Sequence, residues 1–133
     1  VPAGERATRP VCGVWSLKDL LGHVADWEAV GFQGLRSMAV GLPPDVEPID
    51  DIEAFNQTHV RARGDQPWAQ VWADLNNVRH EFLSLLEGMD DAALARCFPY
   101  PWGERGTAYQ WASVFFHHDR EHAEGLRMAL LVG

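Results

Sequence analysis

Apolar residues recur every three or four positions along much of this chain, which is the spacing of one face of an α-helix. The pattern is regular between residues 67 and 88, where apolar side chains stand at positions 71, 75, 78, 82, 85 and 86. No long stretch alternates apolar with polar residues, as a half-buried strand would. We therefore predict an all-α fold. Long amphipathic helices joined by loops bury their apolar faces best in an antiparallel up-and-down four-helix bundle.

Capping residues and breaks rich in Gly or Pro predict where the helices begin and end. They place helices over residues 16–40, 50–62, 67–88, 90–96 and 107–131. Ser16 and Asp19, three residues apart, match a capping box for the first helix, and Asp50 is placed to cap the second. Segments 1–14 and 97–106 contain several Gly and Pro residues and are predicted to be loops.

Composition narrows the classes of function. The 133 residues are 47% hydrophobic and 23% charged, which fits one globular domain over residues 1–133. The net charge of −8 would repel nucleic-acid backbones and anionic membrane surfaces, so we expect neither partner. No apolar run approaches the roughly 18 residues that span a bilayer. Cys12 and Cys97 are too few for a disulfide scaffold, and no signal peptide is visible, so a cytoplasmic location is expected.

Two histidines interrupt an apolar stripe on the last predicted helix. Trp111, Phe115, His118, His122 and Gly125 follow one another at steps of four, three, four and three, so they share one face. Because the stripe is otherwise apolar, it is expected to face the core of the bundle.

A third histidine lies in a similar stripe on the first predicted helix. His23 shares its face with the apolar residues Leu20, Trp27 and Val30. If the two stripes meet, His118 and His122 reach one ion from adjacent turns, and His23 adds a third imidazole. Three neutral imidazoles suit Zn²⁺ or Ni²⁺ and leave one coordination position open. Asp26 or Glu28 would be placed to accept a hydrogen bond from an imidazole.

Other interpretations of these residues stay open at this point. A histidine on an apolar face is often a packed core residue without an ion. His117 and Glu121 are also four apart and form a rival pair on a more polar stripe. Asn56 and His59 would line the mouth of a metal pocket or face solvent, and Trp102 would roof the pocket or merely cover the end of the bundle. The candidate pocket residues are therefore Trp27, Asn56, His59 and Trp102.

Several segments together resemble one protein family. WSLKDLLGHVADWE (15–28) resembles the segment of DinB-like four-helix bundles that starts with Trp-Ser/Thr and ends around a metal-binding histidine. HDREH (118–122) resembles the H-x-x-x-H motif on their final helix, and FNQTHV (55–60) and the Pro-Trp-Gly loop (101–103) are also similar. The likeness covers most of the chain.

This resemblance implies more than the spacing does. It places the family's metal-ligand triad on His23, His118 and His122. The superfamily includes transferases and isomerases that use bacterial low-molecular-weight thiols. The resemblance therefore implies a metal-dependent S-transferase, isomerase or detoxification enzyme that acts on a small-molecule substrate. A thiol that carries carboxylates would need basic residues at the pocket mouth, for which Arg61 and Arg105 are the candidates.

Three alternatives accompany that expectation. They are a metal-dependent hydrolase that uses water in place of the thiol, a metal-free bundle that binds or destroys a reactive small molecule, and an interaction protein that only dimerises. Members of the family normally begin with a further helix before the loop that corresponds to VPAGERATRPVCG. The resemblance thus implies that this N-terminal helix is missing from the chain or replaced, and it suggests a homodimer.

Overall fold

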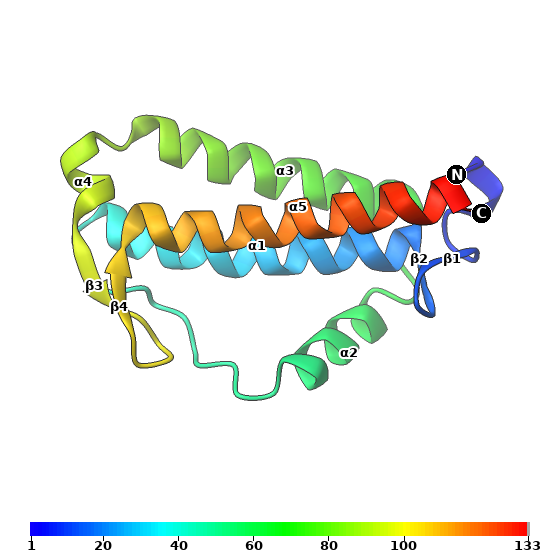
Figure 1. Cartoon of the computed structure of the whole chain (residues 1–133), viewed down its shortest axis with the longest axis horizontal. Coiled ribbons are helices and arrows are strands. Elements are labelled where there is room, and N and C mark those ends of the chain that lie inside the picture. The colour runs from blue at the N-terminus through cyan, green and yellow to red at the C-terminus, as the bar shows by residue number, and fades with distance from the viewer. Residues whose placement is uncertain (133) are drawn as a thin grey trace.

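The computed structural model describes residues 1–132 and is built mainly from helices (Figure 1). The helices are α1 (Leu17–Ala39), α2 (Ile52–Ala62), α3 (Trp68–Gly88), α4 (Asp91–Ala95) and α5 (Ala108–Val132), with one 3₁₀ turn at Ala3–Glu5. Two short hairpins join them, one formed by β1 (Pro10–Cys12) and β2 (Trp15–Ser16), the other by β3 (Cys97–Pro99) and β4 (Arg105–Thr107). The predicted mostly helical bundle is confirmed.

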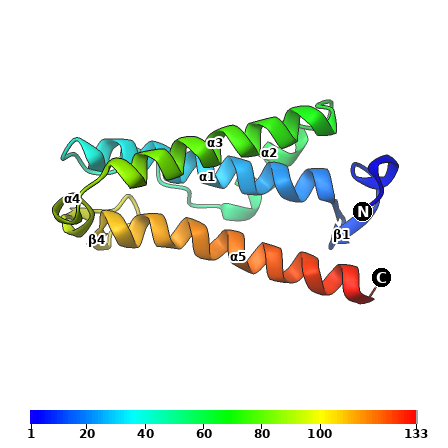
Figure 2. The same ribbon diagram turned by 90° about the horizontal axis from the view of Figure 1, so that it is seen from above.

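Helix α1 lies at the centre of the bundle and packs against α2, α3 and α5. The directions of α1, α2, α3 and α5 alternate along the chain, as in an up-and-down arrangement (Figure 1). The most extensively packed pair of helices is α1 and α3. These two helices run in parallel, because the connection through α2 returns the chain to the end of the bundle at which α1 begins. Seen from above, α5 runs antiparallel to both of them (Figure 2).

The predicted capping box at the start of α1 is present. The Ser16 hydroxyl accepts a hydrogen bond from the backbone N–H of Asp19 at 3.2 Å, and the Asp19 carboxylate accepts one from the backbone N–H of Ser16 at 3.0 Å. The cap of α2 is shifted by one residue from the prediction. Asp51, not Asp50, accepts from the backbone N–H of Ala54 at 2.9 Å.

The segment predicted as a loop over 97–106 contains a hairpin instead. Strands β3 and β4 pair antiparallel, with Phe98 opposite Gly106, and the turn between them includes Gly103 at φ +96°. Phe98 and Tyr100 are buried by this arrangement, so the hairpin covers one end of the bundle. Strands of three residues are too short to produce a readable alternation in the sequence, which is why periodicity missed them.

An aromatic core holds α1, α3 and α5 together. Trp111 is fully buried, and its indole N–H donates to the carbonyl oxygen of Gly31 at 2.9 Å. A Cβ at Gly34 would collide with the indole of Trp111, so glycine is what lets α5 approach α1 so closely. Phe82 of α3 and Phe115 of α5 complete the contact. This close approach brings side chains of α1 and α5 within reach of one another.

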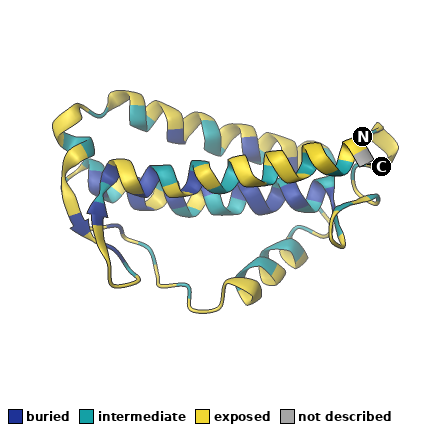
Figure 3. Ribbon diagram, in the orientation of Figure 1, coloured by how far each residue is buried: buried dark blue, intermediate teal, exposed yellow. Residues whose placement is uncertain are grey.

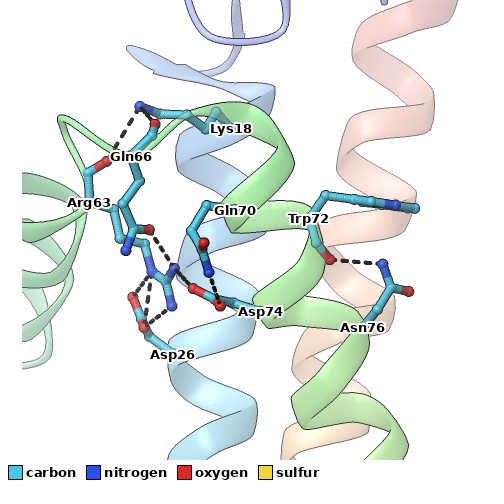
Figure 4. A network of polar contacts seen from close by, with 8 residues as sticks. All are labelled: Lys18, Asp26, Arg63, Gln66, Gln70, Trp72, Asp74 and Asn76. Carbon is cyan, nitrogen blue, oxygen red and sulfur yellow. Dashed lines mark hydrogen bonds and ion pairs between the residues drawn. The ribbon is translucent and has the colours of Figure 1, made fainter.

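Polar contacts hold α2 in place, together with one ring contact, that of Phe55 with Trp27 at 4.6 Å between centroids. All residues of α2 are described, and none of them is buried. Arg63, which follows the helix, donates to Asp26 of α1 and to Asp74 of α3, both at 2.8 Å. The ammonium group of Lys18 donates to the carbonyl oxygens of Arg63 and Gln66 at 3.4 and 2.9 Å (Figure 4). It also donates to the carbonyl oxygen of Gly64 at 3.0 Å. This network fixes the end of α2 between α1 and α3.

Burial is concentrated on α1 and on the faces that meet it, whereas α2 is intermediate or exposed (Figure 3). Cys12 and Cys97 are free and exposed. Within residues 1–132 we find no helix with the length and hydropathy needed to cross a bilayer.

Candidate metal centre

Three imidazoles from two helices meet at one point in the bundle. His23 comes from the N-terminal half of α1, and His118 and His122 come from adjacent turns of α5. The Nε2 atom of His23 lies 3.1 Å from the Nε2 atoms of both His118 and His122, and those two atoms lie 3.0 Å apart. The structure thus brings together the three histidines that the sequence singled out.

The spacing of these nitrogens fits one metal ion. A hydrogen bond needs one N–H and one lone pair, so three Nε2 atoms in mutual contact always include a pair that presents the same group. Nitrogen ligands about 2.0–2.1 Å from one ion, in contrast, lie about 3.3–3.4 Å apart at tetrahedral angles and about 2.8–3.0 Å apart at right angles, and the observed distances fall between these values. Among the described residues, these three histidines form the group of potential metal ligands whose ligand atoms lie close enough together to share one ion.

Burial keeps the imidazoles in the form that binds metals. Burial lowers the pKa of His23 to about 3, with smaller contributions from the neighbouring imidazoles of His118 and His122. The carboxylate of Asp119 and a hydrogen bond with Asn56 oppose this shift. Burial also lowers the pKa of His122. At neutral pH both imidazoles are therefore uncharged, and each has a lone pair available for a ligand bond.

The three histidines open onto a cavity of about 810 Å³. Trp27, Asn56 and Trp102 line it, and the Trp27 indole N–H donates to the Asn56 side-chain oxygen at 2.9 Å, which ties α1 to α2. His59 lies outside this lining. Its ring stacks on Phe55 at 3.9 Å between centroids, and its Nδ1 is bonded to the Phe55 carbonyl oxygen at 2.9 Å. A molecule in the cavity would therefore reach the Nε2 atoms past aromatic walls.

The rival pair of residues points away from this cluster. The Nε2 atom of His117 lies 3.1 Å from a carboxylate oxygen of Glu121, and the two side chains are 70% and 67% exposed. The pair forms a surface contact along the outer side of α5.

The carboxylate next to the centre belongs to a residue that the sequence analysis missed. Oδ1 of Asp119 is buried, lies 3.7 Å from Nδ1 of His118 and has no hydrogen-bond partner. A carboxylate facing Nδ1 favours the tautomer that leaves Nε2 free for a metal. The signal was present in the sequence, because Asp119 lies between the two histidines of HDREH.

Asp26 and Glu28, the acidic residues expected to accept a hydrogen bond from an imidazole, have other partners. Asp26 is bound to Arg63, as described above. Glu28 is completely buried and accepts from Nε of Arg79 at 2.9 Å, and Arg79 also contacts Asp119 at 3.3 Å. Burial, followed by the neighbouring carboxyl group of Asp119, raises the pKa of Glu28 to about 8. The centre is thus backed by a cluster of two carboxyl groups and one guanidinium.

Comparison with known proteins agrees with this architecture. The chain is similar to the solved structure of YfiT from Bacillus subtilis, described as "a probable metal-dependent hydrolase with an unusual four-helix bundle topology". The TM-score is 0.76 at 18% identity, over 97% of this chain and 73% of that chain, so the likeness concerns the fold. No curated protein sequence matches the chain. A family model described as the DinB superfamily matches residues 1–125, and the chain therefore belongs to the DinB superfamily.

Proposed function

We propose that this protein is a metal-dependent hydrolase whose divalent ion, zinc or nickel, is held by His23, His118 and His122. The observation that carries the proposal is the convergence of three Nε2 atoms, 3.0 to 3.1 Å apart, at the wall of a large cavity. A divalent metal in that position supplies Lewis-acid chemistry that makes water a competent nucleophile near neutral pH. The name given to YfiT, a probable metal-dependent hydrolase, supports the same reaction class.

The residues of the chain have distinct tasks in this proposal. His23 offers an uncharged imidazole, because its pKa is lowered to about 3. The carboxylate of Asp119, 3.7 Å from Nδ1 of His118, favours the tautomer of His118 that leaves Nε2 free. The aromatic walls, including Trp27 and Trp102, limit the access of bulk water and hold the substrate beside the histidines.

A thiol-dependent transferase, the reaction that the sequence resemblance implied, would use the same ligands. Arg61 and Arg105, the candidates to bind carboxylates of such a thiol, are exposed and lie outside the cavity lining. The described lining includes Glu47 and Asp50 and no lysine or arginine. An acidic thiol would therefore meet like charge, which favours water as the nucleophile.

Metal content and turnover test the proposal together. Protein purified without a histidine tag is expected to hold about one equivalent of zinc or nickel per chain. His23→Ala and His118→Ala are expected to lose the ion. Two matched controls are expected to keep the ion. His80→Ala alters an exposed histidine on α3, and His117→Ala alters the rival pair.

Hydrolysis of a panel of activated esters and amides supplies the second measurement. Activity is expected to disappear with a chelator, to return when zinc is added, and to be absent in His118→Ala. A wild-type protein that takes up neither zinc nor nickel contradicts the proposal. Turnover that requires an added thiol assigns the chain to the transferase class instead.

A further inference from the structure

The cavity beside the histidines carries information about its ligand. Its volume of about 810 Å³ lies in the range of small-molecule sites. The walls combine aromatic rings with branched aliphatic side chains, among them Trp15, Trp27, Phe115, Val30, Ile49 and Ile52. An apolar body of the size of one or two aromatic rings fits such walls, because its burial replaces contact with water.

Trp102 provides a flat surface at this cavity. It lies between β3 and β4, and its ring is stacked on that of Trp111, with 5.2 Å between centroids and 9° between the planes. Trp111 is fully buried and thereby fixes the orientation of Trp102, which remains 51% exposed. A large aromatic side chain held rigidly and left half open favours stacking against a ring or an organic cation.

Charge is distributed unevenly around the cavity. The inner wall holds the three histidines. The rim holds the exposed carboxylates of Glu47 and Asp50, from the connection between α1 and α2. Among the described lining residues no lysine or arginine balances them. The rim therefore attracts a cation, tolerates a neutral group and repels an anion.

We propose that the cavity binds a small molecule with an apolar, aromatic body whose outer end is uncharged or cationic, and that it discriminates against anionic ligands. This inference rests on the proposed function in taking the cavity as the substrate site. The apolar walls, the fixed ring of Trp102 and the acidic rim act on different parts of the ligand: body, stacking face and outer end.

A matched series of ligands tests this inference on the full chain in the presence of a chelator. The series is 2-naphthylmethylamine, 2-naphthylmethanol and the carboxylate 2-naphthaleneacetate, which share one apolar body and differ in charge at pH 7. Binding is measured by isothermal titration calorimetry. The amine and the alcohol are expected to bind, and the carboxylate is expected to bind about tenfold more weakly than the amine.

Variants separate the contributions of the rim and the ring. Glu47→Gln combined with Asp50→Asn is expected to reduce the preference for the amine over the carboxylate to less than about threefold. Glu53→Gln combined with Glu87→Gln changes the net charge equally outside the lining and is expected to leave the preference intact. Trp102→Ala is expected to weaken the binding of all three ligands. Trp72→Ala, on the exposed side of α3, is expected to leave the three affinities unchanged.

Each outcome bears on the inference. Binding of the carboxylate as tightly as the amine, binding of no member of the series, or unchanged affinities in Trp102→Ala would overturn it. Because the chelator removes any metal, these results do not depend on the proposed hydrolase activity. A protein that binds the series in the expected order but never takes up zinc or nickel contradicts the proposed function alone.

Discussion

The carboxylate of Asp119 joins the three histidines to the interior of the bundle. One of its oxygens faces Nδ1 of His118, and the other contacts Arg79, which in turn holds the buried Glu28. A carboxylate behind a ligand histidine increases the basicity of the imidazole and restricts its rotation. The identity of this one side chain is therefore expected to set how tightly a metal is held.

Asp119→Asn is predicted to lower the affinity for zinc about 10- to 100-fold, because the amide keeps the shape of the side chain but loses its charge. A competition titration with a chelating dye measures the affinity, and circular dichroism checks that the helices persist. Glu121→Gln is the matched control, since it removes a charge beside His122 on the exposed side of α5. Equal affinities in wild type and Asp119→Asn would show that Asp119 has no part in holding the metal.

Glu28 is predicted to make the stability of the metal-free protein fall between pH 6.5 and 8. Burial first, and then Asp119, raises its pKa from 4.5 to about 8, so in this window the folded chain holds a proton that the unfolded chain has released. The free energy of unfolding therefore falls as the pH rises, by about 1–2 kcal/mol over the window. Below pH 6.5, His23 and His122 make the free energy of unfolding rise with pH instead. Their pKa values are lowered in the folded chain, so protonation of these imidazoles favours the unfolded chain.

Urea unfolding at several pH values measures this dependence. Glu28→Gln keeps a neutral side chain at every pH and is expected to lose the decline between pH 6.5 and 8. Glu87→Gln, at an exposed position of α3, is expected to retain it. A decline of equal size in wild type and Glu28→Gln would assign the pH dependence to another group.

At the scale of the elements, α2 differs from the long helices in how it is anchored. None of its residues, all of them described, is buried. Its position depends on the contacts of Arg63 and Lys18, on the hydrogen bond between Trp27 and Asn56, and on the ring contact between Trp27 and Phe55. Since α2 supplies one wall of the cavity, this anchoring determines the shape of the site.

Arg63→Ala is predicted to loosen α2 without unfolding the bundle. The substitution leaves the carboxylates of Asp26 and Asp74 without their shared cation, while the aromatic core of α1, α3 and α5 is untouched. Hydrogen exchange is expected to accelerate over residues 52–62 and to stay slow in the centres of α1 and α5. Arg61→Ala, an exposed arginine of the same helix, is the control and is expected to leave exchange unchanged.

Sequence information of this kind is strong for single elements and weak for their arrangement. The helices were predictable because caps such as Ser16 with Asp19 and the apolar stripes act over a few residues. The three histidines were predictable as one cluster because each stripe had to face the core. The β3–β4 hairpin was too short for a period, and the parallel packing of α1 on α3 depends on the long connection through α2, which no local pattern encodes.

The network around the histidines was also beyond local reasoning. Asp26 and Glu28 are near His23 in the sequence, but the turn of the helix directs them toward Arg63 and Arg79. Asp119 is adjacent to His118, and only the packing of α5 against α1 and α3 reveals that its carboxylate is buried beside the ring. Which acidic residue supports the centre is thus decided by tertiary contacts.

At the scale of the whole molecule, the three histidines connect parts of the chain that are far apart in sequence. His23 is separated from His118 by 95 residues and from His122 by 99. In the unfolded chain the three imidazoles are rarely close together, so a metal that needs all three binds the folded state far better. Metal binding is therefore coupled to the folding of the entire bundle.

Zinc at about 100 times its dissociation constant is predicted to raise the free energy of unfolding by about 2.7 kcal/mol. Thermal and urea unfolding with and without zinc measure this gain, in a background of Cys12→Ser and Cys97→Ser, because both exposed thiols could bind zinc on their own. Magnesium, which prefers oxygen ligands, is expected to give no gain. His23→Ala removes the ligand on α1, so zinc can no longer join α1 to α5 and its gain should disappear. A full gain in His23→Ala would mean that zinc binds elsewhere, and the three-histidine centre would then have no coupling to the fold.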